Sequence, residues 1–482
     1  MTPVVFLPAL PELFLALASL GLLLIGVLAA PERTAKGIPL LGALALTVTL
    51  VLVLQAPAGR VEAFYGMFVT DGFAVFAEAL VLVAAIATLL VGLRFNTWQG
   101  IDRFELPVLV LLSVTGMLAM ITANDLITFY IGLELQSLPL YVLAAFKRDS
   151  ARSTEAGLKY FVLSALSSGL LLFGASLLYG FSAGTSYAAI GHALAQPDAT
   201  TAIGALIGLI FLLAGVAFKL SAAPFHMWTP DVYEGSPTSI TAFFAVGPKV
   251  AALAVFARLA FGPLAGLATA WHDVAWLLSV ISLLVGGFAA IAQTNLKRMM
   301  AYSSISHVGF ALMGLAAGSE EGLRGMLVYL GVYLFMNLGT FTVLMGLGRD
   351  GEFAESMSDL AGLSKTRPGA AFALTIFMFS LAGLPPTAGV FAKMLVLLPA
   401  LHAGMPGLAI LGIVMSAVAC FYYLRVVKIM YFEEPGRALD ADVASGTQRT
   451  IFALAACVVL FLCVIPGPFL SIAGAAAHTL FP

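Results

Sequence analysis

Long apolar runs, separated by short polar segments, follow one another along the whole chain. Each run approaches or exceeds the roughly 20 residues that an α-helix needs to cross the hydrocarbon core of a bilayer. The alternating strands of a membrane β-barrel, each roughly ten residues long, do not occur. The pattern predicts an all-α polytopic membrane protein with about 14 transmembrane helices. The expected spans are 9–30, 38–56, 72–93, 105–122, 125–146, 156–180, 201–234, 237–260, 273–292, 297–317, 322–348, 369–402, 407–431 and 450–475.

Two of these spans are too long for a single straight crossing. Residues 201–234 would form a helix of about 50 Å, against about 30 Å of hydrocarbon. Pro224 interrupts this run, and Pro385 and Pro386 interrupt 369–402 in the same way. Proline removes a backbone donor and breaks the helical ladder. Broken helices at membrane depth are tolerated where they line a polar cavity or are buried in protein, so we expect two such helices here.

The two broken spans occupy matching places in two halves of the chain. Spans four to eight form one five-helix unit and spans nine to thirteen form another, with the broken helix fourth in each. Because five is odd, the second unit enters the membrane from the opposite side, as in the inverted repeats of transporters. The predicted organisation is helices 1–3 in residues 1–104, a first repeat (helices 4–8, broken helix 7) in 105–260, a second repeat (helices 9–13, broken helix 12) in 273–431, and helix 14 in 450–475.

The basic residues indicate which ends of these spans share a side of the membrane. One set of alternate loops holds most of the arginines and lysines, whereas the other holds only Arg60, Arg258 and Arg324. The positive-inside rule places the rich set in the cytoplasm and both termini outside. Residues 1–31 contain no basic residue, so the first span is expected to be a retained helix and not a cleaved signal. The rich set, with the adjoining span ends, contains Arg33, Lys36, Arg94, Arg103, Lys147, Arg148, Arg152, Lys297, Arg298, Arg349, Lys365, Arg367, Arg425, Lys428, Arg437 and Arg449.

Composition excludes several classes of function. Only 10% of the residues are charged and 61% are hydrophobic, and the net charge of -2 comes with no basic stretch that would suggest nucleic-acid binding. The three cysteines lie in apolar segments without metal-ligand spacing, and the chain has no paired haem ligands and no dinucleotide fingerprint. Glu78, near the outer end of the third span, is expected to lie at the membrane interface.

Four lysines fall inside the apolar runs, namely Lys159, Lys219, Lys249 and Lys393. A lysine at the centre of a bilayer costs about 2.5–3.5 kcal/mol, so such a residue normally faces the protein interior and marks an ion or proton path. Glu134 is the most deeply placed acid, and we expect it to pair with Lys219 because a buried carboxylate must be paired or protonated. Making and breaking this pair would move a proton. The alternative is a static buried ion pair that fixes helix packing.

Other side chains could extend such a path. Lys159 lies about one turn into its span on the predicted cytoplasmic side, where it could instead reach the headgroups. His226 follows the first break, and His307 lies about one to two turns inside its span, close in sequence to Tyr302 and several serines. A neutral histidine can pass on a proton from either ring nitrogen, although a single histidine is more often structural.

Four sequence motifs resemble the antiporter-like subunits of proton-pumping NADH:quinone oxidoreductase, which is respiratory complex I. The resemblance covers essentially the whole chain, and residues 227–238 are most similar to the smallest of the three bacterial members of this family. The motifs are KLSAAPFHMWTPDVYEGSPT at 219–238, the segment 124–140, AYSSISHVG at 301–309 and LAGLPPTAGVFAK at 381–393.

This resemblance implies roles for five residues. It implies proton transfer by Glu134, Lys219, Lys249 and Lys393, and a place for Lys159 near the cytoplasmic entry. It also implies that NADH, FMN, iron–sulfur clusters and quinone belong to partner subunits and that this chain binds no cofactor. The implied partners are the other membrane subunits, including neighbouring antiporter-like subunits, and the lipid bilayer. The implied location is the bacterial inner membrane, with both termini in the periplasm.

The expected function is proton translocation, coupled to electron transfer from NADH to quinone in other subunits, with no redox catalysis in this chain. Two alternatives remain at this point. The first is a subunit of a multi-protein cation/proton antiporter or of a membrane-bound hydrogenase with the same fold. The second is a structural membrane subunit that conducts nothing, in which the buried lysines only fix helix packing.

Overall fold

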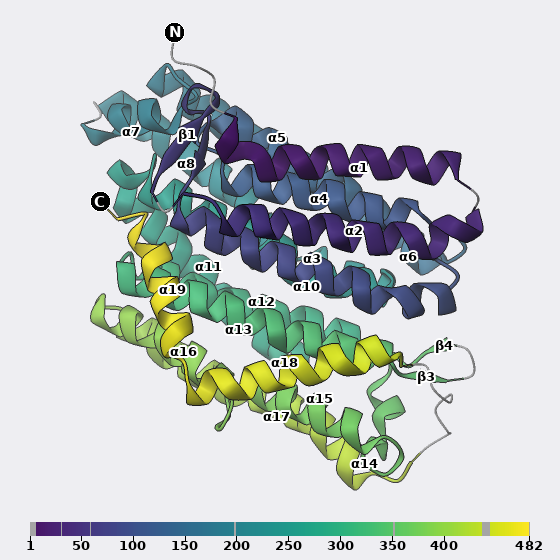
Figure 1. Cartoon of the computed structure of the whole chain (residues 1–482). Helices are drawn as coiled ribbons and strands as arrows, with labels where there is room; N and C mark the ends of the chain where they lie inside the picture. The colour runs from purple at the N-terminus through teal and green to yellow at the C-terminus, as the bar shows by residue number, and fades with distance from the viewer. Residues whose placement is uncertain are drawn as a thin grey trace.

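The structure, a computed structural model of the chain, describes residues 6–29, 31–57, 59–196, 199–349, 352–435 and 444–481. Arg437, one of the basic residues assigned to a side above, lies outside these ranges. Within them, twelve helices are long and apolar enough to cross a membrane, and three shorter apolar helices accompany them. The long helices lie side by side as one bundle (Figure 1). The predicted all-α polytopic fold is therefore confirmed.

The N-terminal helices cover one flank of the bundle (Figure 1). A short antiparallel hairpin, with Val61 opposite Thr70, leads into the third crossing. The Asp71 side chain accepts a 2.8 Å hydrogen bond from the Ala74 amide and so caps that helix. The elements are η1 (Leu7–Ala9), α1 (Leu10–Leu28), α2 (Pro31–Leu54), β1 (Val61–Ala63), η2 (Phe64–Gly66), β2 (Phe68–Thr70) and α3 (Gly72–Trp98).

The first predicted repeat contains its broken helix where the prolines placed it. The chain leaves helical geometry after Leu220 and resumes it at Thr229, so Pro224 lies inside the break. A small additional helix, α7, precedes the broken span and was not predicted. The elements are α4 (Glu105–Ile121), α5 (Leu126–Ala144), α6 (Ala151–Ser182), α7 (Tyr187–Ala195), α8 (Ala199–Leu220), α9 (Thr229–Gly235) and α10 (Thr238–Phe261).

The second predicted repeat packs in the same order as the first. Helix α11 packs most extensively against α12, as α4 does against α5, and the third member of each unit packs against its broken helix. The elements are η3 (Ala265–Leu267), α11 (Ala268–Ile291), α12 (Leu296–Ala316), α13 (Glu320–Met345), β3 (Gly348–Arg349), β4 (Glu352–Phe353), η4 (Met357–Leu360), α14 (Leu363–Thr366), α15 (Pro368–Ala382), α16 (Ala388–His402) and α17 (Pro406–Phe432).

The last predicted span, 450–475, is wrong as a single helix. It consists of α18 (Gly446–Val464) and α19 (Gly467–His478), and α19 turns sharply away from α18 (Figure 1). Pro466 and Pro468 stand at the corner, where a missing amide donor and a fixed backbone angle end the first helix. The two short hairpins and α14 were not predicted either, because long apolar runs carry no signal for such small polar elements.

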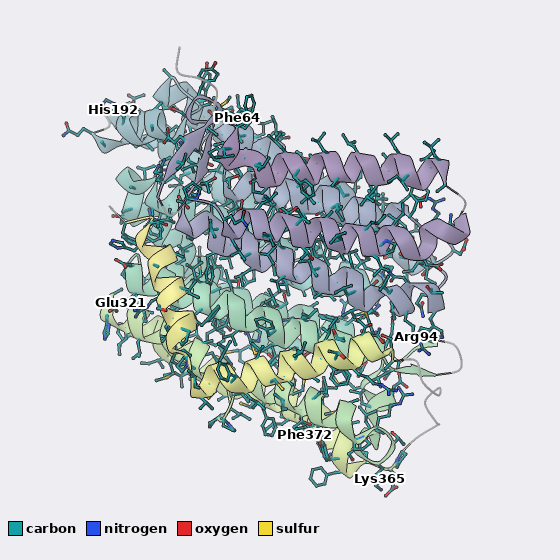
Figure 2. The ribbon with its side chains drawn as sticks, viewed as in Figure 1. Phe64, Arg94, His192, Glu321, Lys365 and Phe372 are labelled. Atoms are coloured by element: carbon teal, nitrogen blue, oxygen red, sulfur yellow. The ribbon has the colours of Figure 1, made fainter. Side chains whose placement is uncertain are left out.

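Burial and charge define the centre and the two ends of the bundle. Helices α10, α12 and α13 are almost wholly enclosed by the others, whereas α1 and α18 expose most of their apolar side chains. Arg94 and Lys365, which were assigned to the same side, lie at one end of the bundle, and His192 and Glu321 lie at the other (Figure 2). The enclosed helices are the ones that carry Lys249 and His307.

Candidate functional site

The first broken helix ends in a defined loop whose backbone groups are satisfied. The Ala223 amide donates to the Ser282 hydroxyl on α11 at 2.9 Å. The Trp228 indole donates to the Phe218 carbonyl at 3.0 Å, which covers part of the open end of α8. Unpaired backbone groups are costly away from water, so these contacts allow a helix to stop at membrane depth.

Lys219 lies in the last turn of α8, next to this loop, and only 3% of its surface is exposed. Its ammonium donates to Ser164 Oγ at 2.6 Å, to Ser137 Oγ at 2.8 Å and to Tyr141 OH at 3.3 Å. An ammonium group has three hydrogens, so these hydroxyls from α5 and α6 satisfy all of them. Lys219 is therefore held by neutral groups alone.

The expected ion pair between Glu134 and Lys219 is not formed, and this part of the prediction is wrong. Ser137 and Tyr141 follow Glu134 on α5 at helical spacing, and their hydroxyls occupy the places around the ammonium. One carboxylate oxygen of Glu134 is buried without a hydrogen-bond partner, although the residue as a whole is half-buried. Glu134 still acts on Lys219 through its charge.

Lys249 lies at the centre of the bundle on α10, which continues through Pro248 without a break. Its ammonium donates to the Ser304 hydroxyl on α12 and lies 5.4 Å above the centroid of the Tyr233 ring. The phenol oxygens of Tyr233 and Tyr333 are close to Ser304, and both are buried without a partner in the structure. Lys249 therefore lies in a pocket of neutral hydroxyl groups, as Lys219 does.

Tyrosines line the space between these two lysines. Tyr141, a partner of Lys219, packs edge-on against Tyr160, with 4.9 Å between the ring centroids. Tyr160 in turn lies close to Tyr233, whose ring contacts Lys249. The two lysine pockets are thus joined by aromatic side chains that carry hydroxyl groups.

His307 lies on α12 between two phenols. Its Nδ1 is 2.5 Å from Tyr329 OH, and its Nε2 is 3.1 Å from Tyr423 OH. A neutral imidazole offers one donor and one acceptor, and a phenol can match either of them. Lys249 and Lys393 both act on His307 through their charges, so the ring lies within electrostatic range of both lysines.

Lys393 reaches from α16 across the second break. Its ammonium donates to the carbonyls of Ala382 at 2.8 Å and Leu381 at 3.1 Å, and to Ser416 Oγ at 2.8 Å. Gly383, at a φ of +83°, ends α15, and a Cβ there would approach Lys393 Cδ to 2.9 Å. The missing side chain of this glycine therefore makes room for the lysine.

Two of the proposed relay residues lie apart from this set. Tyr302 precedes His307 by five residues, which places it about 140° around the helix, and it lies beside Arg298. The structure therefore does not bring Tyr302 to His307. His226 is half-buried in the loop between α8 and α9, and its Nδ1 has no hydrogen-bond partner there.

Lys159 lies near one end of the bundle, where 41% of its side chain is exposed. Its ammonium forms ion pairs of 2.7 Å with both Glu155 and Asp231. Arg298 also binds Asp231, at 2.6 Å. Unlike the three deeper lysines, Lys159 belongs to a network of opposite charges that is open to solvent.

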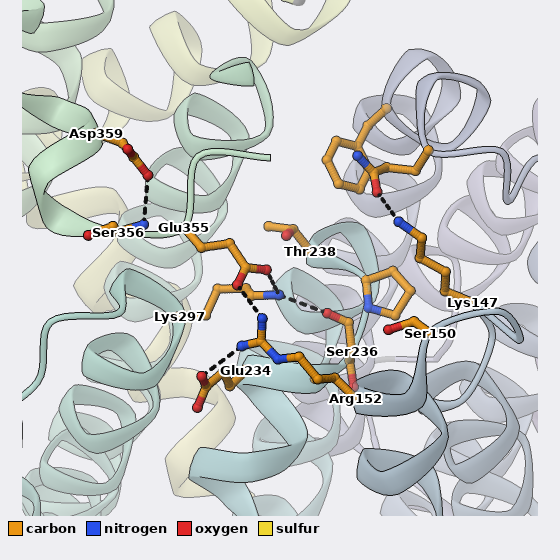
Figure 3. A pocket seen from close by; sticks show the side chains of 14 residues that line it. Lys147, Ser150, Arg152, Glu234, Ser236, Thr238, Lys297, Glu355, Ser356 and Asp359 are labelled. Carbon is orange, nitrogen blue, oxygen red and sulfur yellow. Dashed lines mark hydrogen bonds and ion pairs between the residues drawn. The ribbon is translucent and has the colours of Figure 1, made fainter. Parts of the chain in front are cut away.

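A polar cavity of about 470 Å³ adjoins this network, and sequence reasoning missed it. Glu355 forms ion pairs with the Lys297 ammonium at 2.8 Å and with Arg152 at 3.3 Å, and Arg152 also binds Glu234 (Figure 3). Lys297, at the predicted cytoplasmic end of the span 297–317, is only 3% exposed and donates to the Ser236 carbonyl. A hydrophobicity pattern cannot reveal this cavity, because loops distant in sequence build it.

Burial raises the pKa of Glu355, but the charge of Lys297 and the hydrogen bonds that the carboxylate accepts outweigh this effect. The pKa therefore lies below its usual value, and Glu355 is ionised at neutral pH.

Glu78, which was expected at the membrane interface, is enclosed within the protein near the start of α3. It is 2% exposed on α3 and lies against Glu12 of α1. No apolar run marks the first turn of α1 as the neighbour of this acid, so the sequence pattern gave no signal for their contact.

A helical bundle with two broken helices, and with buried lysines held by neutral groups, defines an antiporter-like membrane subunit. The family model described as "NADH:quinone oxidoreductase/Mrp antiporter, TM" matches residues 123–419, which include both breaks. The chain has the fold of a chain of the Mrp complex from Dietzia sp. DQ12-45-1b, with a TM-score of 0.86 at 20% identity over 99% of this chain and 98% of that one. This second likeness shows the fold alone.

Similarity along the full length identifies the branch of this family. The chain is 50% identical to NADH-quinone oxidoreductase subunit N of Paramagnetospirillum magneticum, over 98% of each protein. It is 32% identical to a chain of respiratory complex I from Thermus thermophilus, with a TM-score of 0.81 over 96% of this chain and 98% of that one. The chain belongs to the NADH-quinone oxidoreductase subunit N family, which confirms the resemblance inferred from its motifs.

Proposed function

We propose that this chain is a proton-translocating membrane subunit of a bacterial NADH:quinone oxidoreductase, in which partner subunits carry out the electron transfer from NADH to quinone. The observation that carries this proposal is that Lys219, Lys249 and Lys393 are each at most 5% exposed. Among the described residues, none of the three forms an ion pair with a carboxylate. Burying a charge is costly unless it can be neutralised, and a lysine is neutralised by losing its proton.

A purely structural role fits these lysines less well. Structural buried cations have a bound counter-ion, as Arg258 has in Asp71, where the contact is bidentate at 2.8 and 2.9 Å. Hydroxyl groups, in contrast, can accept from an ammonium and donate to an amine. Ser164 accepts from both Lys219 and Tyr141, so its own hydroxyl hydrogen can turn toward Lys219 when the amine is neutral.

The arrangement supports a path along the membrane plane through the two predicted repeats, 105–260 and 273–431. The polar cavity beside Glu355 and the Lys159 network would supply protons from the cytoplasmic side. The proton would then pass among Lys219, Lys249, His307 and Lys393, with Glu134 setting the field at the first lysine. Moving one charge against about 150 mV costs about 3.5 kcal/mol, which must come from the redox reaction.

The same proposal includes the surroundings of the chain. It would lie in the inner membrane with both termini in the periplasm, next to other antiporter-like subunits. NADH, FMN, iron–sulfur clusters and quinone would be bound by partner subunits. The alternative function is that of a subunit of a separate cation/proton antiporter. Purification of the chain in a complex without NADH dehydrogenase subunits would support this alternative.

Replacing Lys219 in the assembled complex tests the proposal. We expect Lys219→Met to lower the rate of NADH oxidation that is coupled to proton uptake by at least about tenfold, or to lower the number of protons moved per NADH to a smaller whole number. The reason is that the neutral methionine side chain cannot carry a proton. The measurement is proton movement into vesicles that contain the complex. Lys365→Met, at an exposed ion pair, is the control. Unchanged coupling in Lys219→Met, Lys249→Met and Lys393→Met, with normal assembly, would support the structural subunit instead.

A further inference from the structure

A second group of buried ionisable residues lies outside the lysine path, where α1, α3 and α10 meet. Glu12, in the first turn of α1, is 7% exposed, and Glu78, on α3, is 2% exposed. Their carboxyl groups lie within hydrogen-bonding reach of one another. Glu12 Oε2 and Glu78 Oε1 are both buried without a hydrogen-bond partner among the described residues.

The cation beside this pair is already engaged. The guanidinium of Arg258 binds Asp71 through two hydrogen bonds of 2.8 and 2.9 Å, and its Nε donates to the Ile121 carbonyl at 2.9 Å. Asp71 and Arg258 are 1% and 4% exposed and neutralise each other. Among the described residues, the charged groups that act on Glu78, besides Glu12, are Arg258 and Asp71 of this ion pair.

Two adjacent carboxylates buried in such a place would repel one another strongly. A proton bound to one of the two carboxyl groups removes the repulsion between two negative charges. It also allows that carboxyl group to donate a hydrogen bond to the other. The Thr122 hydroxyl lies within hydrogen-bonding reach of Glu12 and 2.9 Å from the Leu118 carbonyl, so it can donate to either group.

The place of the pair in the fold puts it near one end of the bundle. Glu12 lies two residues into α1 and Glu78 six residues into α3, which is about 3 Å and 9 Å from the starts of these helices. Both helices begin at the end of the bundle that the charge pattern assigns to the periplasm. The pair is therefore much closer to this outer surface than to the opposite one.

We propose that Glu12 and Glu78 form a proton-binding site in which the two carboxyl groups share a proton, and that this site releases protons to the outer side during turnover. The release role rests on the proposed proton-translocating function, whereas the shared proton does not. In the bound state one carboxyl group donates to the other. In release, the O–H bond breaks and water at the outer surface takes the proton, which leaves two negative charges on the pair until it is protonated again.

Infrared difference spectroscopy of the assembled complex at neutral pH tests the shared proton. We expect a deuterium-sensitive carbonyl band of a protonated carboxyl group in the wild type. The Glu12→Gln/Glu78→Gln double variant should lack it, and each single Gln variant should shift it. Glu62→Gln is the control, because Glu62 is half exposed and paired with Arg60 on the same side. Identical carboxyl bands in the wild type and the double variant, or removal of the band by added Na⁺, would overturn the site.

Proton pumping tests the release role separately. We expect Glu12→Gln and Glu78→Gln each to lower the protons released per NADH by at least about twofold, with recovery in Glu78→Asp, which retains a titrating group. If the infrared band behaves as expected but both Gln variants pump normally, the release role is wrong and the proton-binding site remains. The proposed function fails on a different result, namely normal pumping when Lys219, Lys249 and Lys393 are replaced.

Discussion

The two broken helices carry a lysine each, but they hold it in different ways. Lys219 belongs to the half-helix before its break, and its ammonium donates, among the described residues, to side-chain hydroxyls from α5 and α6. Lys393 belongs to the half-helix after its break and reaches back to the carbonyls of Leu381 and Ala382 at the end of α15. Matching positions in the two predicted repeats therefore do not give matching chemistry.

The difference bears on the charge of each lysine. The carbonyls at the end of a helix carry partial negative charge and lack partners within the helix, so they favour a cation. A carbonyl cannot donate a hydrogen bond, whereas a hydroxyl can. The second site is thus suited to retain a proton, and the first is suited to lose and regain one as the field of Glu134 changes.

The strongest test of this comparison changes Gly383, which gives Lys393 its access to the carbonyls. We expect Gly383→Ala to disturb the second break, because a φ of +83° costs alanine about 1–2 kcal/mol and its Cβ would meet Lys393 Cδ at 2.9 Å. Coupled turnover of the complex should fall by at least about tenfold. Proton pumping, with complex assembly measured in parallel, checks this.

Gly404 provides the matched control for that variant. It also has a positive φ, of +77°, but no atom lies within 4 Å of the position of a Cβ. Gly404→Ala therefore has the same backbone cost without the clash. Equal losses in the two variants would mean that the backbone alone matters at Gly383 and that room for Lys393 does not.

Removing one hydroxyl from each lysine should have a smaller and unequal effect. Ser164→Ala takes the shortest contact from Lys219 and leaves a buried donor unpaired, at about 1–3 kcal/mol, so turnover should fall about tenfold or more. Ser416→Ala leaves Lys393 its two carbonyls, so the loss should be less than about threefold. The rate of coupled NADH oxidation measures both. A larger effect of Ser416→Ala would reverse the assignment of the two sites.

Much of the fold follows from the sequence because the bilayer limits what an apolar run can do. Pro224 and Pro386 also located both breaks, because each lies in a run too long for one crossing; Pro248, in a run of ordinary length, leaves α10 unbroken. Pro466 and Pro468 carried the same information in the last span and mark the corner between α18 and α19. Small amphipathic elements such as α7 lie outside the reach of this reasoning.

The side chains that surround each lysine were harder to predict. Glu134 is the nearest acid to Lys219 by depth, yet depth does not fix the rotation of α5, which brings Ser137 and Tyr141 to the ammonium instead. Glu12 and Glu78 are separated by 66 residues and meet only because α1 packs near the start of α3. Hydropathy gives the level of a residue in the membrane but not its neighbours.

The smallest expected effect concerns Glu355, beside the polar cavity and away from both breaks. Its pKa lies below the usual value because the charge of Lys297 outweighs the effect of burial. A lowered pKa in the folded state contributes stability at neutral pH, and this contribution is lost as pH falls through the folded-state pKa.

Glu355→Gln should therefore destabilise the assembled complex by about 1 kcal/mol at pH 7 and leave it unchanged at a pH well below 4. Thermal unfolding of the wild type and the variant across this pH range measures the difference, with Glu62→Gln as the exposed control. If the difference in thermal stability grew as the pH fell, it would contradict the ion pair between Glu355 and Lys297. It would also remove the contrast between the polar cavity, which opposite charges stabilise, and the lysine sites, which neutral groups surround.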